Sequence, residues 1–98
     1  MIEIKEPKQF QWDRGNQHKS SDKHNVSQLE AEQIFSNQPL MLLEDKSHSQ
    51  NEIRFHALGR TNDQRKLHIT FTIRGDQIRI ISARPMHKKE RQNYEKNS

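Results

Sequence analysis

The sequence contains no cysteine, which excludes disulfide bonds and thiolate metal sites. Only 29% of its residues are hydrophobic and 6% are aromatic. No apolar run is long enough for a membrane span or an N-terminal signal peptide. These absences fit a reducing compartment, and we expect a cytoplasmic protein. A chain of 98 residues forms one domain and buries ~60–65% of its unfolded surface. The core should therefore be thin, and a binding partner would add stability.

Positive charge is concentrated at the end of the chain. Residues 1–73 hold ten Lys or Arg and ten Asp or Glu, so their charges cancel. Residues 74–98 hold seven Lys or Arg against three acids, which accounts for the net charge of +4. A charge run of this kind is often only a solvated surface. Its position beside a basic strand favours a polyanionic partner instead.

Residues 67–84 have the alternating pattern of a β-hairpin. Gly75 and Asp76 form a two-residue turn of type II′. This turn pairs Ile73 with Ile78, Phe71 with Ile80 and Thr72 with Arg79. One face of the hairpin is then apolar, with Ser82 on it as a buried hydroxyl. The other face carries His68, Thr70, Thr72, Arg74 and Arg79, with Ile81 and Ala83 among them.

The first half of the chain predicts one short strand and two helices. The strand covers Phe10 to Trp12. A helix over 14–23 follows, with Asp13 as N-cap and Asn25 as terminator. Ser27 and Glu30 form a capping box for the second helix, which should end near Asn37, before Pro39. Its apolar stripe is Leu29, Ala31, Ile34 and Phe35.

The second half predicts strands and a last helix. Leu40 to Leu43 reads as a buried strand, and residues 53–60 alternate as another strand before a turn at 61–64. A charged helix should run from His87 to Glu95, with Met86 and Tyr94 available for packing. The fold class is therefore α+β: an antiparallel sheet with helices packed on one face and a C-terminal helix. We expect a single domain over residues 10–98 and a loose lead-in over residues 1–9.

Five short motifs occur in order along most of the chain: Phe10-x-Trp12-Asp13, Lys23-His24-x-Val26-Ser27, Arg54-Phe55 with Gly59, Arg79 to Arg84, and Lys89-Glu90-Arg91-x-x-Tyr94. Together they resemble the BrnT family of bacterial type II toxins, small ribonucleases with a RelE-like fold. The family pattern usually has Gly where Asn25 stands and Asn where Ser20 stands. The resemblance implies an endoribonuclease toxin that cleaves RNA in the cell that makes it and arrests growth. It also implies a co-encoded BrnA-type antitoxin, two toxins per antitoxin dimer, and operator DNA contacted only through the antitoxin.

Cleavage of RNA without a metal requires a base for the 2′-hydroxyl, a cation for the phosphorane and an acid for the leaving oxygen. Arg79 and Arg84 are the best candidates for the phosphate, because the guanidinium fork suits it and stays charged. The alternative for Arg84 is that it caps the last helix or pairs with an acid in that helix, such as Glu90. Arg54 and Arg74 come next, and either could equally be a solvated or ion-paired strand residue.

The proton carrier has several candidates. Lys23 and His24 form one possible centre, although a histidine at a helix end is more often a cap or a packing residue. His56 and His68 point to the polar side of their strands, and either can carry the proton. Tyr94 is another possible acid or a plain core residue.

Two functions from different classes remain open. There is no His-x-x-x-His motif, no paired-carboxylate motif and no glycine-rich phosphate loop, so we expect no metal and no cofactor. The first function is the endoribonuclease toxin. The second is a noncatalytic RNA- or DNA-binding protein that uses the same basic face. Both predict salt-dependent binding, but only the first predicts new RNA ends.

Overall fold

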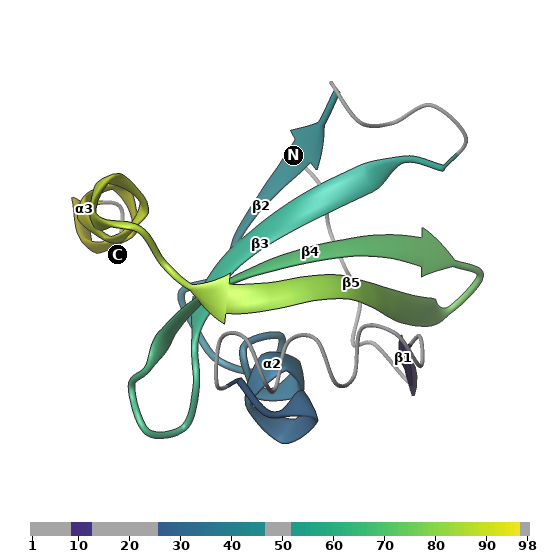
Figure 1. Ribbon diagram of the computed structural model, residues 1–98, viewed down its shortest axis with the longest axis horizontal. Helices are drawn as coiled ribbons and strands as arrows, with labels where there is room; N and C mark the ends of the chain where they lie inside the picture. Colours follow the sequence, from purple (N-terminus) through teal and green to yellow (C-terminus); the bar gives the residue numbers. More distant parts are fainter. Residues whose placement is uncertain (1–8, 13–25, 47–51, 97–98) are drawn as a thin grey trace.

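The computed structural model describes residues 9–12, 26–46 and 52–96. They form an α+β domain with a five-stranded sheet in the order β1-β5-β4-β3-β2 (Figure 1). The strands are β1 (Gln9–Trp12), β2 (Met41–Asp45), β3 (Arg54–Arg60), β4 (Lys66–Arg74) and β5 (Gln77–Pro85). The helices are α2 (Gln28–Gln33) and α3 (Lys88–Lys96). The helix expected over residues 14–23 lies outside the described residues.

The β4–β5 hairpin has the predicted register near its turn. Ile73 pairs with Ile78, Phe71 with Ile80 and Thr72 with Arg79. Gly75 has a φ of 62°, which a type II′ turn requires at its first central position. The local pattern of the two arms was therefore sufficient to predict the turn and the pairs beside it.

A β-bulge places the residues at the C-terminal end of β5 on the face of the sheet opposite to the one predicted. The register shifts between Thr70 and Phe71, so that Thr70 pairs with Ser82 whereas Phe71 pairs with Ile80. Ile81 is the extra residue of this bulge. Our prediction for Ser82 was wrong, because it is exposed on the polar side. Ala83 was also wrongly placed, since it pairs with Ile69 and is fully buried.

The strands β2 to β5 form the predicted antiparallel meander, and β1 joins β5 in parallel. The prediction of a buried strand at Leu40 to Leu43 was wrong in one respect. The strand is β2, which lies at the edge of the sheet, and Leu43 is 52% exposed. Its two faces differ, because Leu42 packs against the main core whereas Met41 packs under α3.

One face of the sheet, here called the core face, carries Phe55, Ala57, Ile69, Phe71 and Ile80. Helix α2 covers it (Figure 1). The ring of Phe35 stands edge-on to that of Phe71, with 5.2 Å between their centroids. Aromatic pairs in this geometry add to the stability that burial itself supplies.

The capping box of α2 is present as predicted, with Ser27 Oγ accepting from the Glu30 amide at 3.1 Å. The helix is shorter than expected and ends at Gln33, with Ile34 as C-cap. Ala31 and Ile34 are fully buried, but Leu29 is 67% exposed and does not belong to the apolar stripe. Helix α2 makes fewer than two turns, and it reaches the sheet through the side that carries Ala31 and its C-cap Ile34.

The opposite face, here called the polar face, carries Arg54, His56, Thr70, Thr72 and Arg79. Helix α3 packs on one end of it through a small second core of Leu58, Met86 and Tyr94. The hydroxyl of Tyr94 donates to the carbonyl of Pro39 at 2.6 Å. The helix is therefore fixed at a defined height above this end of the sheet.

Candidate active site on the polar face

Cross-strand pairing arranges the polar face in three rows across β3, β4 and β5. The rows are Leu58–His68–Arg84 beside α3, His56–Thr70–Ser82 in the middle, and Arg54–Thr72–Arg79 toward the hairpin turn. Three of the arginines predicted as phosphate ligands therefore share one face. The bulge is essential to this arrangement, because Arg79 and Arg84 have opposite parity in a regular strand.

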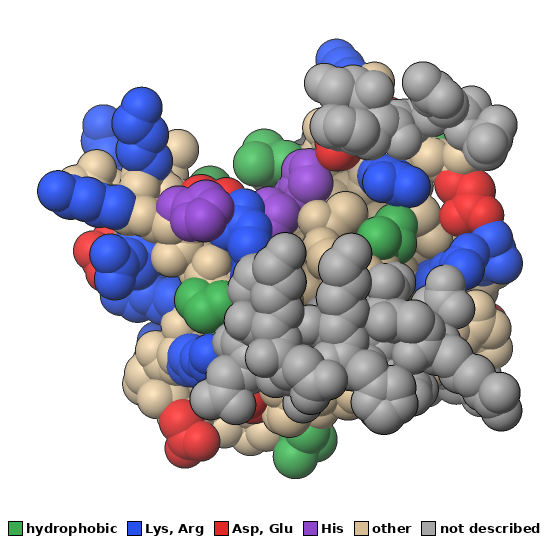
Figure 2. Space-filling view, in the orientation of Figure 1, with side chains coloured by type: hydrophobic (Ala, Val, Ile, Leu, Met, Phe, Trp, Pro, Cys, Tyr) green, Lys and Arg blue, Asp and Glu red, His purple; other side chains and the backbone are tan. Residues whose placement is uncertain are grey.

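A hollow of about 420 Å³ lies between the first two of these rows and α3, and no residue of the third row lines it. Its floor is formed by the sheet, and α3 supplies one wall. Figure 2 shows histidine side chains in the middle of this face, beside the basic side chains of α3. The lining residues are Leu43, His56, Leu58, His68, Arg84, Lys89, Glu90 and Asn93.

His56 is held from both sides of its ring. Its Nε2 lies 2.9 Å from Oδ2 of Asp45, and its Nδ1 lies 3.1 Å from Oγ1 of Thr70. The Asp45 side chain is only 12% exposed. A carboxylate accepts hydrogen bonds, so Nε2 is the protonated nitrogen of neutral His56 and Nδ1 accepts from the Thr70 hydroxyl. This arrangement fixes one tautomer and points a lone pair toward the neighbouring strand.

His68 is the more buried of the two histidines, and its ring centroid lies 4.7 Å from that of His56. Burial and then the nearby charge of Arg84 lower the pKa of His68 to about 4. Its Nε2 lies 3.7 Å from Oε2 of Glu90, and its Nδ1 has no hydrogen-bond partner among the described residues. His68 is therefore neutral near neutral pH and cannot serve there as an acid.

Arg84 makes the ion pair with Glu90 that the sequence left as its alternative role. The two side chains meet fork to fork, with distances of 2.8 and 3.0 Å. Glu90 Oε1 also accepts from the His87 amide at the start of α3. Burial raises the pKa of Glu90, but the hydrogen bonds from Arg84 and His87 outweigh it and hold that pKa at about 2. Glu90 is thus a poor base, and it orients Arg84 at the edge of the hollow.

Two of the other arginines, Arg74 and Arg79, lie near Glu52. Arg79 Nη1 lies 4.0 Å from Glu52 Oε1, and Arg74 forms an ion pair with the same carboxylate. The hydrogen bond from Arg74 lowers the pKa of Glu52. Arg74 is half-exposed at the hairpin end, whereas Arg79 lies within the third row.

Two of the predicted site residues, Lys23 and His24, lie outside the described residues. Asp45, Lys89 and Asn93 are parts of the site that sequence reasoning missed. Parity along β2 places Asp45 on the same side as Met41. Its position beside His56 depends on the β2–β3 register, which no local sequence pattern gives.

Metal ligands and membrane-spanning helices are both absent from the part of the chain that the structure describes. No group of three His, Asp or Glu side chains is placed there to hold a metal ion. None of the described helices is both long enough and apolar enough to span a bilayer.

The fold and the polar face together define a small α+β protein with arginine and histidine side chains gathered on one face of its sheet. Residues 12–90 match the model of a family described as "Ribonuclease toxin, BrnT, of type II toxin-antitoxin system". This match covers most of the chain, and the protein belongs to that family. A comparison with curated proteins gave no match. Membership identifies the chain as a type II toxin of the ribonuclease kind and implies an antitoxin partner.

Proposed function

We propose that this toxin is a metal-independent endoribonuclease and that the hollow on the polar face is its active site. The observation that carries the proposal is the Asp45–His56 pair, at 2.9 Å, in the middle row between arginine-bearing rows. An imidazole fixed by a carboxylate is suited to accept a proton, because the carboxylate stabilises the imidazolium that forms. The arginines supply the positive charge that a phosphorane needs in the absence of a metal.

The reaction begins when the substrate's 2′-hydroxyl replaces the Thr70 hydroxyl at Nδ1 of His56 and gives its proton to that nitrogen. The 2′-oxygen then forms a bond to the adjacent phosphorus, and the bond from phosphorus to the 5′-oxygen breaks. The leaving 5′-oxygen receives that proton from His56 through a water molecule, so that His56 returns to its neutral form and the product is a 2′,3′-cyclic phosphate. Arg54 and Arg79 on one side, and Arg84 on the other, stabilise the charge that develops on the phosphoryl oxygens.

The test uses purified toxin and an RNA oligonucleotide in the presence of EDTA. We expect cleavage to persist and to leave a 2′,3′-cyclic or 3′-phosphate end. A single 2′-deoxy nucleotide at the cleavage position should block it. Arg79→Ala should lower the rate ~30–1000-fold, since one charge interaction with a transition state contributes ~2–4 kcal/mol. Arg74→Ala is the matched control, and its exposed ion pair should matter little.

Two results would overturn the assignment. Activity lost in EDTA and restored by a divalent metal would show that a metal, not the His56 site, supplies the chemistry. Tight, salt-dependent RNA binding that gives no new RNA ends would support the alternative of a noncatalytic RNA- or DNA-binding protein.

We further propose that a BrnA-type antitoxin neutralises this toxin and that expression of the toxin alone arrests growth. An antitoxin dimer that presents two binding segments would hold two toxins in a heterotetramer with twofold symmetry. The antitoxin would contact operator DNA, with the toxin as passenger. The basic composition of residues 74–98 supports an acidic segment in the inhibitor.

Co-expression with the neighbouring gene should restore growth and give one complex of four chains on size exclusion. Binding should also raise the toxin's apparent stability by ~4 kcal/mol at about a thousandfold excess over Kd. A toxin that is harmless when expressed alone, and that forms no complex, would contradict the proposal.

A further inference from the structure

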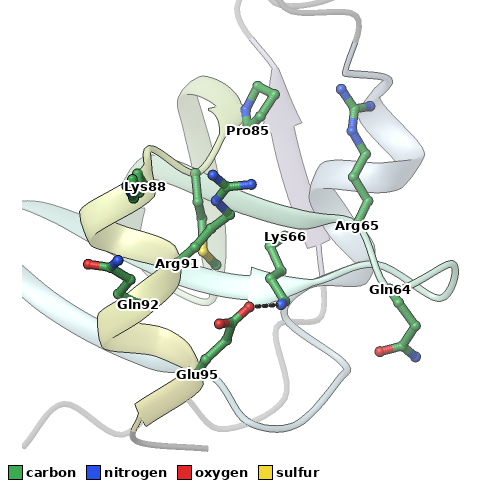
Figure 3. Close-up of a pocket in the computed structure, with 9 residues that line it drawn as sticks. Gln64, Arg65, Lys66, Pro85, Lys88, Arg91, Gln92 and Glu95 are labelled. Carbon is green, nitrogen blue, oxygen red and sulfur yellow. Dashed lines mark hydrogen bonds and ion pairs between the residues drawn. The ribbon is translucent and has the colours of Figure 1, made fainter.

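A second cavity, of about 510 Å³, lies against α3, and Figure 3 shows the residues that line it. It is formed where the start of β4, the end of β5 and α3 meet. The residues that line it are Gln64, Arg65, Lys66, Pro85, Met86, Lys88, Arg91, Gln92 and Glu95. None of these residues lines the hollow that contains His56.

Helix α3 separates the two cavities because different stripes of it face each one. Lys88, Arg91, Gln92 and Glu95 have the spacing i, i+3, i+4, i+7, so they form one stripe along the helix. The residues that face the hollow are Lys89, Glu90 and Asn93, on the neighbouring stripe. A substrate that crosses α3 from the active site would therefore arrive at the second cavity.

The charges in this cavity are strongly unbalanced. Its lining includes four cations but only one carboxylate, that of Glu95. Lys66 pairs with Glu95, as Figure 3 shows, and Arg65 pairs with Glu30 at 3.0 Å. Lys88 and Arg91 are exposed, and neither side chain makes a hydrogen bond or a close ion pair within the described part of the chain, although the charge of Arg91 contributes to lowering the pKa of Glu95. Two cations with unused donors are therefore available to an external anion.

We propose that this cavity is an accessory site for the phosphate backbone of single-stranded RNA, outside the cleavage position. The inference rests on the proposed function only in taking RNA as the substrate. A protein segment is a poorer fit, because protein interfaces depend on apolar and aromatic anchors in pockets. Of the apolar residues in its lining, Met86 is buried and Pro85 is exposed.

The test measures, by fluorescence anisotropy at several salt concentrations, how tightly the toxin binds an RNA that it cannot cleave. This RNA carries a 2′-deoxy nucleotide at every position where the toxin would otherwise cut. The RNA-binding constant K falls as the salt concentration rises. For each phosphate group of a single strand that the protein no longer neutralises, the plot of log K against log salt should become less steep by ~0.7. We expect Lys88→Ala and Arg91→Ala each to show this reduction and to weaken binding severalfold. Lys96→Ala is the control, since Lys96 is an exposed cation of the same helix outside the cavity. Gln92→Lys should make the same plot steeper by a similar amount and should tighten binding.

A cleavage assay separates this proposal from the proposed function. A dinucleotide substrate is too short to span α3, so its rate of cleavage should be unchanged in Lys88→Ala and Arg91→Ala, whereas KM for longer RNA should rise. Unchanged salt slopes in all variants would overturn the accessory site even if the wild-type toxin cleaves RNA. Weaker antitoxin binding with unchanged RNA binding would overturn it too, in favour of a protein contact. Absence of wild-type cleavage would instead count against the proposed function alone, since the binding assay needs no catalysis.

Discussion

The side chain of Asp45 has the most specific role at the scale of single residues. It bonds to Nε2 of His56 at 2.9 Å and so decides which ring nitrogen carries the proton. His56 lines the hollow, whereas Asp45 is not among the residues that line it. Asp45 is thus a positioning residue for the proposed proton transfer.

We expect Asp45→Asn to lower kcat by roughly 100-fold, because an amide donates as well as accepts and can stabilise the wrong tautomer of His56. The pH profile of the rate should shift as well, and ¹⁵N NMR of His56 should show proton exchange between tautomers. Asp63→Asn is the control, in the exposed turn between β3 and β4. An unchanged pH profile and tautomer in a folded Asp45→Asn protein would remove Asp45 from the mechanism.

At the scale of elements, the close approach of α2 to the sheet depends on Gly59 in β3. A Cβ atom at this position would lie 2.9 Å from Cβ of Ile34 and 3.3 Å from Cδ1 of Leu40. The first distance is shorter than van der Waals contact allows. The helix can therefore rest on β3 only because the strand has no side chain there.

Gly59→Ala should destabilise the protein by ~1–3 kcal/mol, as overpacking of a filled core does. The midpoint of urea unfolding measures this cost. Gly75→Ala provides a comparison, since a Cβ there meets nothing within 4 Å and the cost comes from the positive φ alone, ~1–2 kcal/mol. If Gly59→Ala proves as stable as the wild type, α2 is packed less tightly than the structure indicates.

At the scale of the whole molecule, the buried ion pair and histidine make stability depend on pH. In the folded state the pKa of His68 falls from 6.5 to about 4, and that of Glu90 falls from 4.5 to about 2. The unfolded chain therefore binds more protons than the folded chain, between about pH 4 and 6.5 at His68 and between about pH 2 and 4.5 at Glu90. Stability from these groups is complete above about pH 6.5 and is lost as the pH falls, first through His68 and then through Glu90.

Unfolding free energy should therefore decrease between pH 7 and pH 4, by up to about 3 kcal/mol from His68. Urea titrations across this range provide the measurement. His68→Gln should flatten the dependence, whereas His87→Gln, an exposed control at the start of α3, should not. Stability that rises as the solution is acidified from pH 7 to pH 5 would contradict the assignment.

The division of the buried apolar residues into two small cores bears on how the toxin binds its partners. The main core and the smaller one under α3 lie on opposite faces of a single sheet. On the polar face, His56 and Arg79 remain partly exposed, whereas His68 is buried. We infer that an antitoxin segment laid across this face would both block the hollow and add burial that the chain itself cannot supply.

Features that depend on neighbours along the chain could be predicted from the sequence alone. The Gly75-Asp76 turn, the pairs beside it and the Ser27–Glu30 capping box follow from local spacing. The motifs also sufficed to indicate the family. Strand parity placed His56 and His68 on the polar face for the same reason, because side chains alternate strictly within a regular strand.

Features that depend on register between separate strands required the three-dimensional structure. The bulge at Ile81 moved Ala83 into the core and brought Arg84 to the face of Arg79, and no residue type in β5 signals an extra residue there. The β2–β3 pairing placed Asp45 beside His56 across a connection whose sequence does not fix register. A shift of the strand register by one residue moves every following side chain to the other face of the sheet. The contact between Asp45 and His56 could therefore be recognised only from the three-dimensional structure.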